Sequence, residues 1–453
     1  MMKTIAFIAV LCMGSIAFAQ DDPAAGGTGF GFQAGISLGT DIITDSAGNP
    51  ETWNNLGFKP DLSIGPFGIG FDFTMRFKLM PDPDTAFEAY PGDWVPDYED
   101  SGKRILDLYL PKIMYVRYGQ RGDPLFVKLG SIDDLTLGNG FLVGNYSNTR
   151  FLPELRIFGL NVGVDGQLFN FPFVGVEALT GNLARFDVFG TRLFVRPLIT
   201  TSIPILKDMQ VGATIAVDLD PETFVASTDQ TGLDSIAISG ADIFVPIIKS
   251  ELFPLAAFME LGFQPQGRSG FMLGAGGRAL GFITYGAQLR LLGAGFIPVY
   301  FDANYDLYRA AKAAFMEQDP ADLGLENFAG WLAKAGTSFF DDKIYFEVSV
   351  DGPFAGAEAG STFQGDYPHL RGVAGLREGV LGGFFFDLVY EKYMLGMENA
   401  FFADLVDPNN AVITAAVNYQ SGAAIFTLLY NLRYDPAIND FNVTSSLVTT
   451  IQF

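Results

Sequence analysis

Cysteine and histidine are almost absent from this chain of 453 residues, which holds one of each, Cys12 and His369. Cys12 lies in an N-terminal segment that we expect to be removed. The remainder therefore offers no disulfide, no thiolate metal site and no cysteine nucleophile. Nothing in the sequence places a particular serine beside His369, so the Ser–His pair of a hydrolase is not indicated. The sequence predicts neither an enzyme nor a bound cofactor or metal.

The N-terminal segment has the three parts of an export signal. Lys3 supplies the positive charge, residues 5–13 form a short apolar run, and Ala17-Phe18-Ala19 matches an A-x-A cleavage site. The apolar run is too short to span a bilayer as a helix. We expect residues 1–19 to be a signal peptide and residues 20–453 to form one domain, since no linker or change of composition divides them.

Long apolar runs are also missing. Residues 20–453 contain no uninterrupted run of the ~18 apolar residues that a membrane-spanning helix requires. Yet mean hydropathy is +0.25, and there are 44 Phe and 53 Gly. The apolar residues are spread through the chain in alternation, as in the strands of a transmembrane β-barrel. A large secreted all-β domain would also alternate, but it explains such long apolar faces less easily.

Basic residues are scarce. Lys and Arg number 28 against 51 Asp and Glu, so the formal net charge is −23. A chain with no basic patch cannot neutralise phosphates, which argues against a nucleic-acid partner.

The end of the chain shows what is present instead. Residues 423–453 alternate between an apolar and an increasingly polar set, with a turn at residues 436–440. The apolar set comprises Ala424, Phe426, Leu428, Tyr430, Leu432, Tyr434, Phe441, Val443, Leu447, Ile451 and Phe453. Successive strand side chains point to opposite faces, so the pattern predicts a hairpin with one oily face. If lipid covers that face, the sheet must close, because no backbone group can remain unpaired in hydrocarbon.

This ending resembles that of bacterial outer-membrane β-barrels, whose last strand is amphipathic and ends in an aromatic residue. Phe453, Ile451 and Leu447 carry the resemblance, whereas Ser445 and Thr449 stand where apolar residues are more usual. The whole chain is similar to a porin-like outer-membrane protein. The resemblance implies the outer membrane of a diderm bacterium, contact with its lipid, and recognition of the last strand by the barrel-assembly machinery. A homo-oligomer is compatible with it.

The clearest alternation lies at residues 67–79, where phenylalanine and other apolar residues alternate with glycine and with the polar side chains of Asp72, Thr74, Arg76 and Lys78. Charge of both signs on an inner face is unusual for a sandwich core and ordinary for a wet lumen.

About twenty such segments follow one another. They predict an all-β fold, a single antiparallel transmembrane β-barrel with long external loops and an even number of strands between 18 and 22, with 20 preferred. The expected strands include residues 106–118 and 297–308. Alternation of the connections breaks down between Leu261 and Phe328, so one element there is misassigned or is not a strand.

Two stretches fit the strand pattern poorly. Residues 132–155 are glycine-containing and lightly charged, and form another strand, an external loop, or a loop folded into the lumen as a constriction. Residues 310–323 have a helix-favouring composition. External loops are the preferred interpretation of both. If the first folds inward, Asp133, Asp134 and Arg150 are the candidate constriction.

The charges on the predicted inner faces are close to balanced. We expect these residues to line the pore: Asp72, Arg76, Lys78, Lys128, Glu260, Arg278, Arg290, Asp302, Glu347, Arg371, Arg377 and Arg433. Many of the Asp and Glu residues lie instead in predicted loops. The most acidic of these is residues 81–100, which has seven carboxylates and no basic residue. An acidic loop at a pore mouth raises the local concentration of cations.

The leading hypothesis is a channel for passive diffusion of small hydrophilic solutes, which selects by size and charge without bond chemistry. One alternative is a surface-binding or structural protein that uses the barrel as a pedestal. Another is a transporter of hydrophobic substrates with a plugged lumen, which the high phenylalanine content suggests.

Overall fold

The computed structural model describes most of the chain. The described residues are 30–44, 50–79, 87–94, 105–132, 134–149, 151, 155–225, 229–250, 252–340, 342–357, 364–397, 399–435 and 440–452. The described side chains exclude those of residues 43, 44, 50, 433–435 and 440–444.

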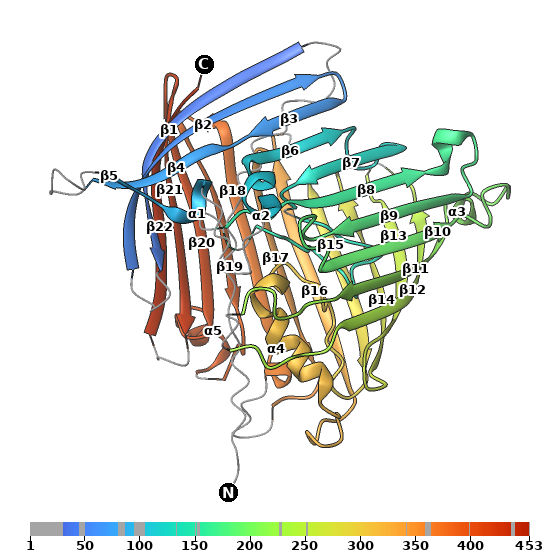
Figure 1. Ribbon diagram of the computed structural model, residues 1–453. Coiled ribbons are helices and arrows are strands. Elements are labelled where there is room, and N and C mark those ends of the chain that lie inside the picture. Colours follow the sequence, from blue (N-terminus) through green and yellow to red (C-terminus); the bar gives the residue numbers. More distant parts are fainter. Residues whose placement is uncertain are drawn as a thin grey trace, which may run out of the picture.

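Strands dominate this part of the chain (Figure 1). They are β1 Phe30–Thr44, β2 Pro50–Ile64, β3 Phe67–Phe71, β4 Phe73–Leu79, β5 Phe87–Ala89, β6 Ile113–Tyr118, β7 Leu125–Gly130, β8 Gly159–Asp165, β9 Val174–Thr180, β10 Val188–Val195, β11 Gln210–Asp218, β12 Ile236–Ile248, β13 Leu255–Phe263, β14 Ser269–Ala279, β15 Ile283–Leu292, β16 Phe328–Phe339, β17 Ile344–Pro353, β18 His369–Leu381, β19 Phe384–Lys392, β20 Ala411–Ser421, β21 Ala424–Asp435 and β22 Asp440–Gln452.

Helices are few and mostly short. They are α1 Pro91–Trp94, α2 Ile105–Tyr109, α3 Pro204–Lys207, α4 Tyr305–Glu317 and α5 Phe401–Asp404, with 3-10 turns at Leu110–Lys112, Gly166–Phe169 and Gln364–Asp366. In the described residues, no helix has both the length and the apolarity to cross a membrane.

Neighbouring strands pair antiparallel in chain order, and β22 returns to pair with β1, from Gly35↔Gln452 to Asp41↔Ser446. β3 and β4 both pair with β2 and are two halves of one strand interrupted at Asp72. β5 only extends β4. Counted this way, the described strands form a closed barrel of twenty. The prediction of an all-β, single antiparallel barrel with 20 strands is confirmed.

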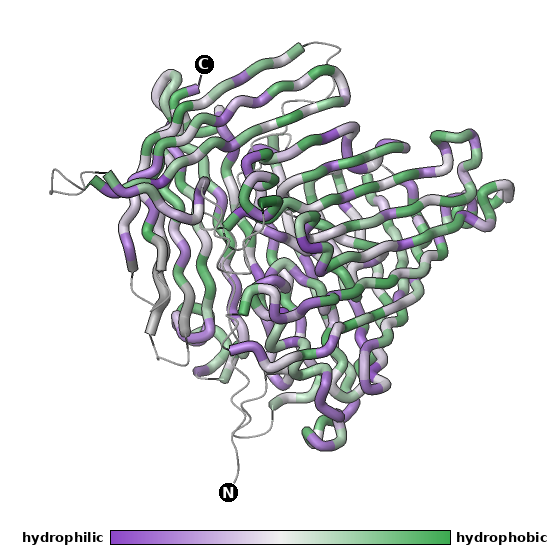
Figure 2. Tube along the Cα trace, in the orientation of Figure 1, coloured by the Kyte–Doolittle hydropathy of each residue, from purple (hydrophilic) through white to green (hydrophobic). Residues whose placement is uncertain are grey.

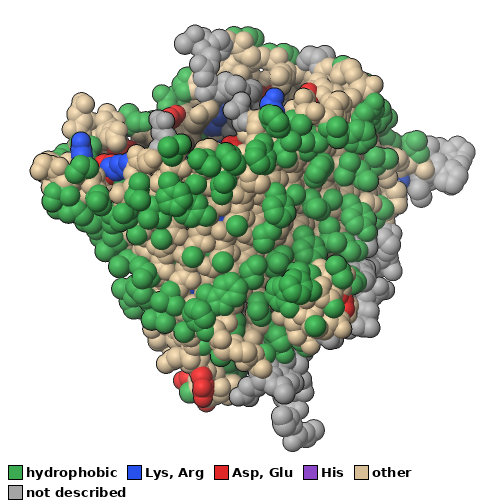
Figure 3. Space-filling view, turned by 180° about the vertical axis from the view of Figure 1, so that it is seen from behind, with side chains coloured by type: hydrophobic (Ala, Val, Ile, Leu, Met, Phe, Trp, Pro, Cys, Tyr) green, Lys and Arg blue, Asp and Glu red, His purple; other side chains and the backbone are tan. Residues whose placement is uncertain are grey.

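The outer face of the barrel is apolar. On β21, Phe426 and Leu428 are exposed, whereas Thr427 and Asn431 point inward and are buried. Hydrophobic and hydrophilic residues alternate along other strands as well (Figure 2). Figure 3 shows hydrophobic side chains spread over the outer surface, with charged side chains gathered towards its upper and lower edges. A hydrocarbon environment requires that every backbone N–H and C=O group is paired and that the outer surface is apolar. The closed barrel meets both requirements, so the chain forms a transmembrane barrel.

The longest connections gather at one end of the barrel and the shortest turns at the other. One end has the turns 65–66, 280–282, 382–383 and 422–423, whereas the other has the connections 131–158, 219–235, 293–327 and 393–410. We call these the turn end and the loop end.

Two long connections of the loop end fold back into the barrel. Residues 134–149 and 293–325, which we call the plug, include the helix α4. Their side chains form an apolar core with inward side chains of β9, β11, β12, β14 and β15. The core includes Leu135, Leu137, Phe141, Leu142, Val143, Tyr146, Phe296, Tyr300, Phe301, Tyr305, Ala313, Phe315 and Met316. The interpretation of residues 132–155 and 310–323 as external loops is therefore wrong.

The plug also explains the break in the predicted alternation. Residues 297–308 were expected to form a strand, but they enter the plug and begin α4. Removing that strand restores an even number. The first half of the expected strand 106–118 is also wrong, because residues 105–109 are helical and β6 begins at Ile113. Both stretches have strand-like side chains, but neither joins the barrel ladder there, and residues 299–301 pair instead with residues 141–144 of the plug.

Glycine on the inner wall makes room for the plug. A Cβ atom at Gly262 would lie 2.7 Å from Cδ2 of Leu142 and 2.8 Å from Cζ of Phe296. One at Gly270 would lie 2.6 Å from Cε1 of Phe296. Real Cβ atoms do not approach other atoms so closely. The plug can therefore pack against the wall at Gly262 and Gly270 because these residues have no side chain.

We expect Gly262→Val to destabilise the folded protein by ~1–3 kcal/mol, because overpacking must displace Leu142 or Phe296 from a filled core. Urea unfolding in lipid vesicles measures the loss. The matched control is Gly286→Ala on β15, where the added Cβ would meet nothing nearer than 3.7 Å. Equal losses in the two variants would contradict the seating of the plug on glycine.

Candidate channel lumen

The inner wall next to the plug is charged. Strands β14–β19 carry inward Arg, Lys, Asp and Glu side chains in neighbouring positions, and we call this set the charged wall. Its members are Arg278, Arg290, Lys334, Glu347, Asp351, His369, Arg371, Arg377, Asp387 and Glu391. Because every second residue of a strand faces inward, adjacent strands in register bring these side chains side by side.

Nearer the loop end, the wall is a continuous chain of charges. Arg290 Nη1 lies 3.2 Å from Oδ2 of Asp351, whose Oδ1 lies 3.2 Å from Nδ1 of His369. His369 Nε2 lies 3.8 Å from Glu391. Nε of Arg371 donates to Glu391 at 3.1 Å. Four strands thus contribute one polar network, from β15 across to β19.

Nearer the turn end, the charged side chains border open space. Arg278 pairs with Asp342 and donates to Ser338 at 2.5 Å. Nζ of Lys334 lies 2.8 Å from Glu347, and Arg377 lies 3.7 Å from Asp387.

A cavity of about 750 Å³ opens against this part of the wall. It is lined by Arg278, Thr284, Thr337, Ser338, Asp342, Lys343, Tyr345, Glu347, Arg377 and Glu378, among others. Both signs of charge and several hydroxyl groups line the same open space, which suits water and polar solutes.

The predicted pore residues of the strand formed by β3 and β4 lie elsewhere on the inner face. Asp72 is buried, with Nη2 of Arg156 at 2.7 Å and Nζ of Lys59 at 3.7 Å. Arg76 pairs with Asp93 of α1 and is buried with it.

Lys78 lies nearer the loop end. Its Nζ is 3.2 Å from Glu51 and sits over the Trp53 ring at 4.0 Å. Near Arg76, the helix α1 in the connection between β4 and β6 covers the wall through Asp93 and Trp94.

Three predicted residues contact the plug or belong to it. Glu260 of β13 accepts hydrogen bonds from the backbone N–H groups of Asn139, at 3.1 Å, and Phe141, at 3.4 Å. It therefore holds the plug to the wall. Asp302 lies within the plug, not on a strand, and pairs with Lys312 at 2.7 Å.

Asp134 lies in the plug and accepts a hydrogen bond from the Asn145 side chain. Lys128 lines a second cavity, of about 320 Å³, with Arg117 and Arg121 beneath the plug. Asp133, Arg150 and the side chain of Arg433 lie outside the described residues, as does most of the acidic stretch 81–100.

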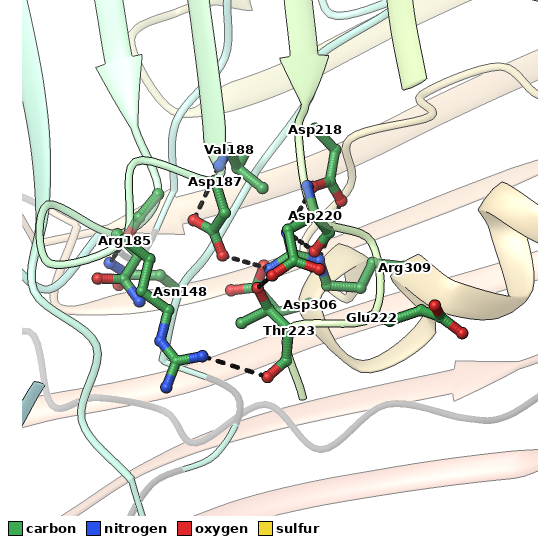
Figure 4. A network of polar contacts seen from close by, with 12 residues as sticks. Asn148, Arg185, Asp187, Val188, Asp218, Asp220, Glu222, Thr223, Asp306 and Arg309 are labelled. Atoms are coloured by element: carbon green, nitrogen blue, oxygen red, sulfur yellow. Dashed lines mark hydrogen bonds and ion pairs between the residues drawn. The ribbon is translucent and has the colours of Figure 1, made fainter. Parts of the chain in front are cut away.

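A cluster that the sequence did not reveal fastens α4 to the barrel (Figure 4). Arg309 donates through Nη1 to Asp187 at 2.8 Å, and through Nε and Nη2 to Asp218 at 3.0 and 2.5 Å. All three side chains are at most 3% exposed. Asp187 precedes β10 and Asp218 ends β11, so one helical side chain joins two strands.

Two phenols complete the cluster. Tyr305 donates to Asp218 at 2.6 Å, and Tyr146 donates to Asp306 at 3.2 Å. Burial raises the pKa of both tyrosines well above the usual value, so they remain hydrogen-bond donors. We call Tyr146, Asp187, Asp218, Tyr305, Asp306 and Arg309 the Arg309 cluster. Its members lie in connections or at strand ends, where alternation gives no signal.

Comparison with known proteins gives only distant matches. No protein-family model matches the chain, and no curated protein matches it. Among solved structures, OccAB2 of Acinetobacter baumannii is 11% identical, with 94% of this chain and 99% of that one covered and a TM-score of 0.36. Pseudomonas aeruginosa OccK2 (OpdF), solved in complex with glucuronate, is 10% identical, with 95% and 98% covered and a TM-score of 0.36.

A third solved structure, CdiB of Acinetobacter baumannii, is 6% identical. It has 93% of this chain and 60% of that one covered, and a TM-score of 0.28. The assignment of the barrel fold is based on the strand pairing, and the candidate function is based on the side chains and cavity of the lumen.

Replacing Arg309 by methionine should destabilise the protein by ~3–5 kcal/mol, because Asp187 and Asp218 are then buried without their cation. Urea unfolding in lipid vesicles again provides the measurement. Arg278→Met is the control, since that ion pair is exposed and its loss should lower stability by only ~0–1 kcal/mol. An unchanged unfolding midpoint for Arg309→Met would show that α4 is held by other contacts.

Proposed function

We propose that the protein is an outer-membrane channel through which small hydrophilic solutes diffuse passively along a charged, aqueous lumen. The proposal rests on the charged wall and on the cavity that opens against it. Arg278, Glu347 and Arg377 point into a barrel whose outside is apolar, and they border space rather than packed side chains. A structural pedestal would not require such a wall.

The location follows from the same architecture. Bacterial barrels of this kind have short periplasmic turns and long external loops. The turn end would therefore face the periplasm and the loop end the outside. β22 pairs with both β21 and β1, so the strand that ends near Phe453 is the one that closes the barrel. This supports the proposal that the assembly machinery recognises it.

Transport would need no bond chemistry. Pairs such as Lys334–Glu347 place opposite charges on neighbouring strands of the wall, so a passing solute would meet groups of both signs. Size selection would come from the plug, which fills the lumen beside β9–β15. The proposed pore lining is centred on the at least partly exposed predicted residues of the charged wall, Arg278, Glu347, Arg371 and Arg377, because Asp72, Arg76 and Glu260 are buried and Asp302 belongs to the plug. Asp133, Asp134 and Arg150 remain the constriction that the sequence predicts.

The plug supports a second candidate, a transporter of hydrophobic substrates. Its apolar core occupies the lumen, as a plugged transporter would require. The charged wall favours the hydrophilic channel over this alternative.

Single-channel recording in planar bilayers tests the proposal. The protein should give stable conductance steps, and its ion selectivity should follow the charged wall. Replacing Arg278 and Arg377 together by glutamine should shift the reversal potential in a KCl gradient towards cation selectivity, because the neighbouring carboxylates remain. Glu347→Gln should shift it towards anion selectivity.

Lys249→Gln is the matched control. Lys249 lies in a connection of the turn end and pairs with Asp208, away from the cavity lining. Its replacement should leave the reversal potential unchanged. A folded and inserted barrel that never conducts would rule out the diffusion channel and favour the plugged transporter.

A further inference from the structure

The helix α4 is fastened at both ends by different chemistry. At its C-terminal end, Arg268 of the connection between β13 and β14 donates to the carbonyl oxygens of Phe315, Met316 and Gln318, at 3.1, 3.0 and 2.7 Å. A guanidinium on these carbonyls satisfies the end of the helix and stays charged at every accessible pH. This end is held independently of pH.

The N-terminal end depends on the Arg309 cluster. There, three carboxyl groups, of Asp187, Asp218 and Asp306, surround one guanidinium (Figure 4). Only two of them receive its hydrogen bonds, while Asp306 is met by the hydroxyl group of Tyr146. With all three ionised, the buried cluster carries an excess of negative charge, which is unfavourable away from water.

The groups that face Asp306 come from every element packed around it. Tyr146 belongs to the first plug segment, Asp187 precedes β10, Asp218 ends β11, and Tyr305 and Arg309 belong to α4. Nearby, Lys312 pairs with Asp302 and donates to the backbone oxygen of Tyr300, at 2.7 Å in both cases. Arg309 is the cation bound within the cluster.

We propose that the Arg309 cluster is a proton-dependent latch, which holds the N-terminal end of α4 in the lumen while Asp306 is protonated and loosens when Asp306 ionises. The C-terminal end, held by Arg268, would act as the fixed point. The lumen would be narrower in acid and wider at neutral pH. The inference deepens the proposed channel function and rests on it for its effect on conductance.

The direction follows from proton linkage. Burial raises the pKa of Asp306 to about 7 in the docked helix, against the lowering effect of Arg309, and Asp187 adds to the rise. In an undocked helix, the pKa returns to about 3.9. The equilibrium constant for docking the helix is therefore largest below pH ~4. It falls about tenfold for each pH unit up to pH ~7 and is constant above that pH.

The first test compares channel conductance at pH 5 and pH 8. Wild-type protein should spend more time in a larger conductance state at pH 8. Asp306→Asn, which mimics the protonated carboxyl, should remain in the smaller state at both pH values. The control is Asp302→Asn, which removes a carboxylate that pairs within the plug, and it should keep the wild-type pH response.

The second test does not depend on conduction. Ala313 of α4 is fully buried, so the thiol of an Ala313→Cys variant, made together with Cys12→Ser, should react with a membrane-impermeant reagent only when the helix loosens. At pH 7, the reaction should be up to about several hundredfold faster than in the same protein with Asp306→Asn, and at pH 5 the ratio should fall to about ten.

These readouts separate the two proposals. A barrel with no conductance at any pH but with the expected thiol reactivity would keep the latch and reject the channel. A conducting barrel whose pH response survives Asp306→Asn, or whose Ala313→Cys thiol reacts equally fast with and without that substitution, would overturn the latch.

Discussion

Closure of the hydrogen-bonded ladder is the constraint on which the rest of the structure depends. In hydrocarbon, an unpaired backbone N–H or C=O group has no water to bind, so a sheet cannot keep a free edge. The pairing of β22 with β1 removes the edges and makes the apolar outer face compatible with lipid. Everything else in the protein is placed relative to this cylinder, either outside as lipid-facing side chains or inside.

A barrel of this size encloses more space than its own inward side chains can fill. The chain meets this in two ways. Beside β9–β15, long connections return and build a second apolar core, with glycine at contact points such as Gly262. Along β14–β19, the wall remains charged and open. The lumen is thus divided between a packed part, which restricts its width, and a wet part, which gives it polarity.

The charged wall and the Arg309 cluster hold their ion pairs in different environments. In the charged wall, partners such as Lys334 and Glu347 are partly exposed, so water screens them and each pair contributes little to stability. In the Arg309 cluster, the ion pairs are buried, so a charge that loses its partner strongly lowers the stability of the protein. Exposed pairs suit selection of passing solutes, whereas the buried cluster suits fastening a helix whose hold varies with protonation.

The sequence by itself determined the barrel. Side-chain period in a strand is two, so the alternation at residues 67–79 and 423–453 identified strands and their outward faces without knowledge of any contact. The recurrence of such segments predicted an even number of strands between 18 and 22, with 20 preferred. It also indicated inward charges such as Arg278 and Glu347. Only the tertiary structure decided what lies inside. Residues 297–308 look like a strand in sequence but enter the plug, and Arg309 meets Asp187 and Asp218 from distant connections. Such contacts depend on where loops return in space, and no local period records that.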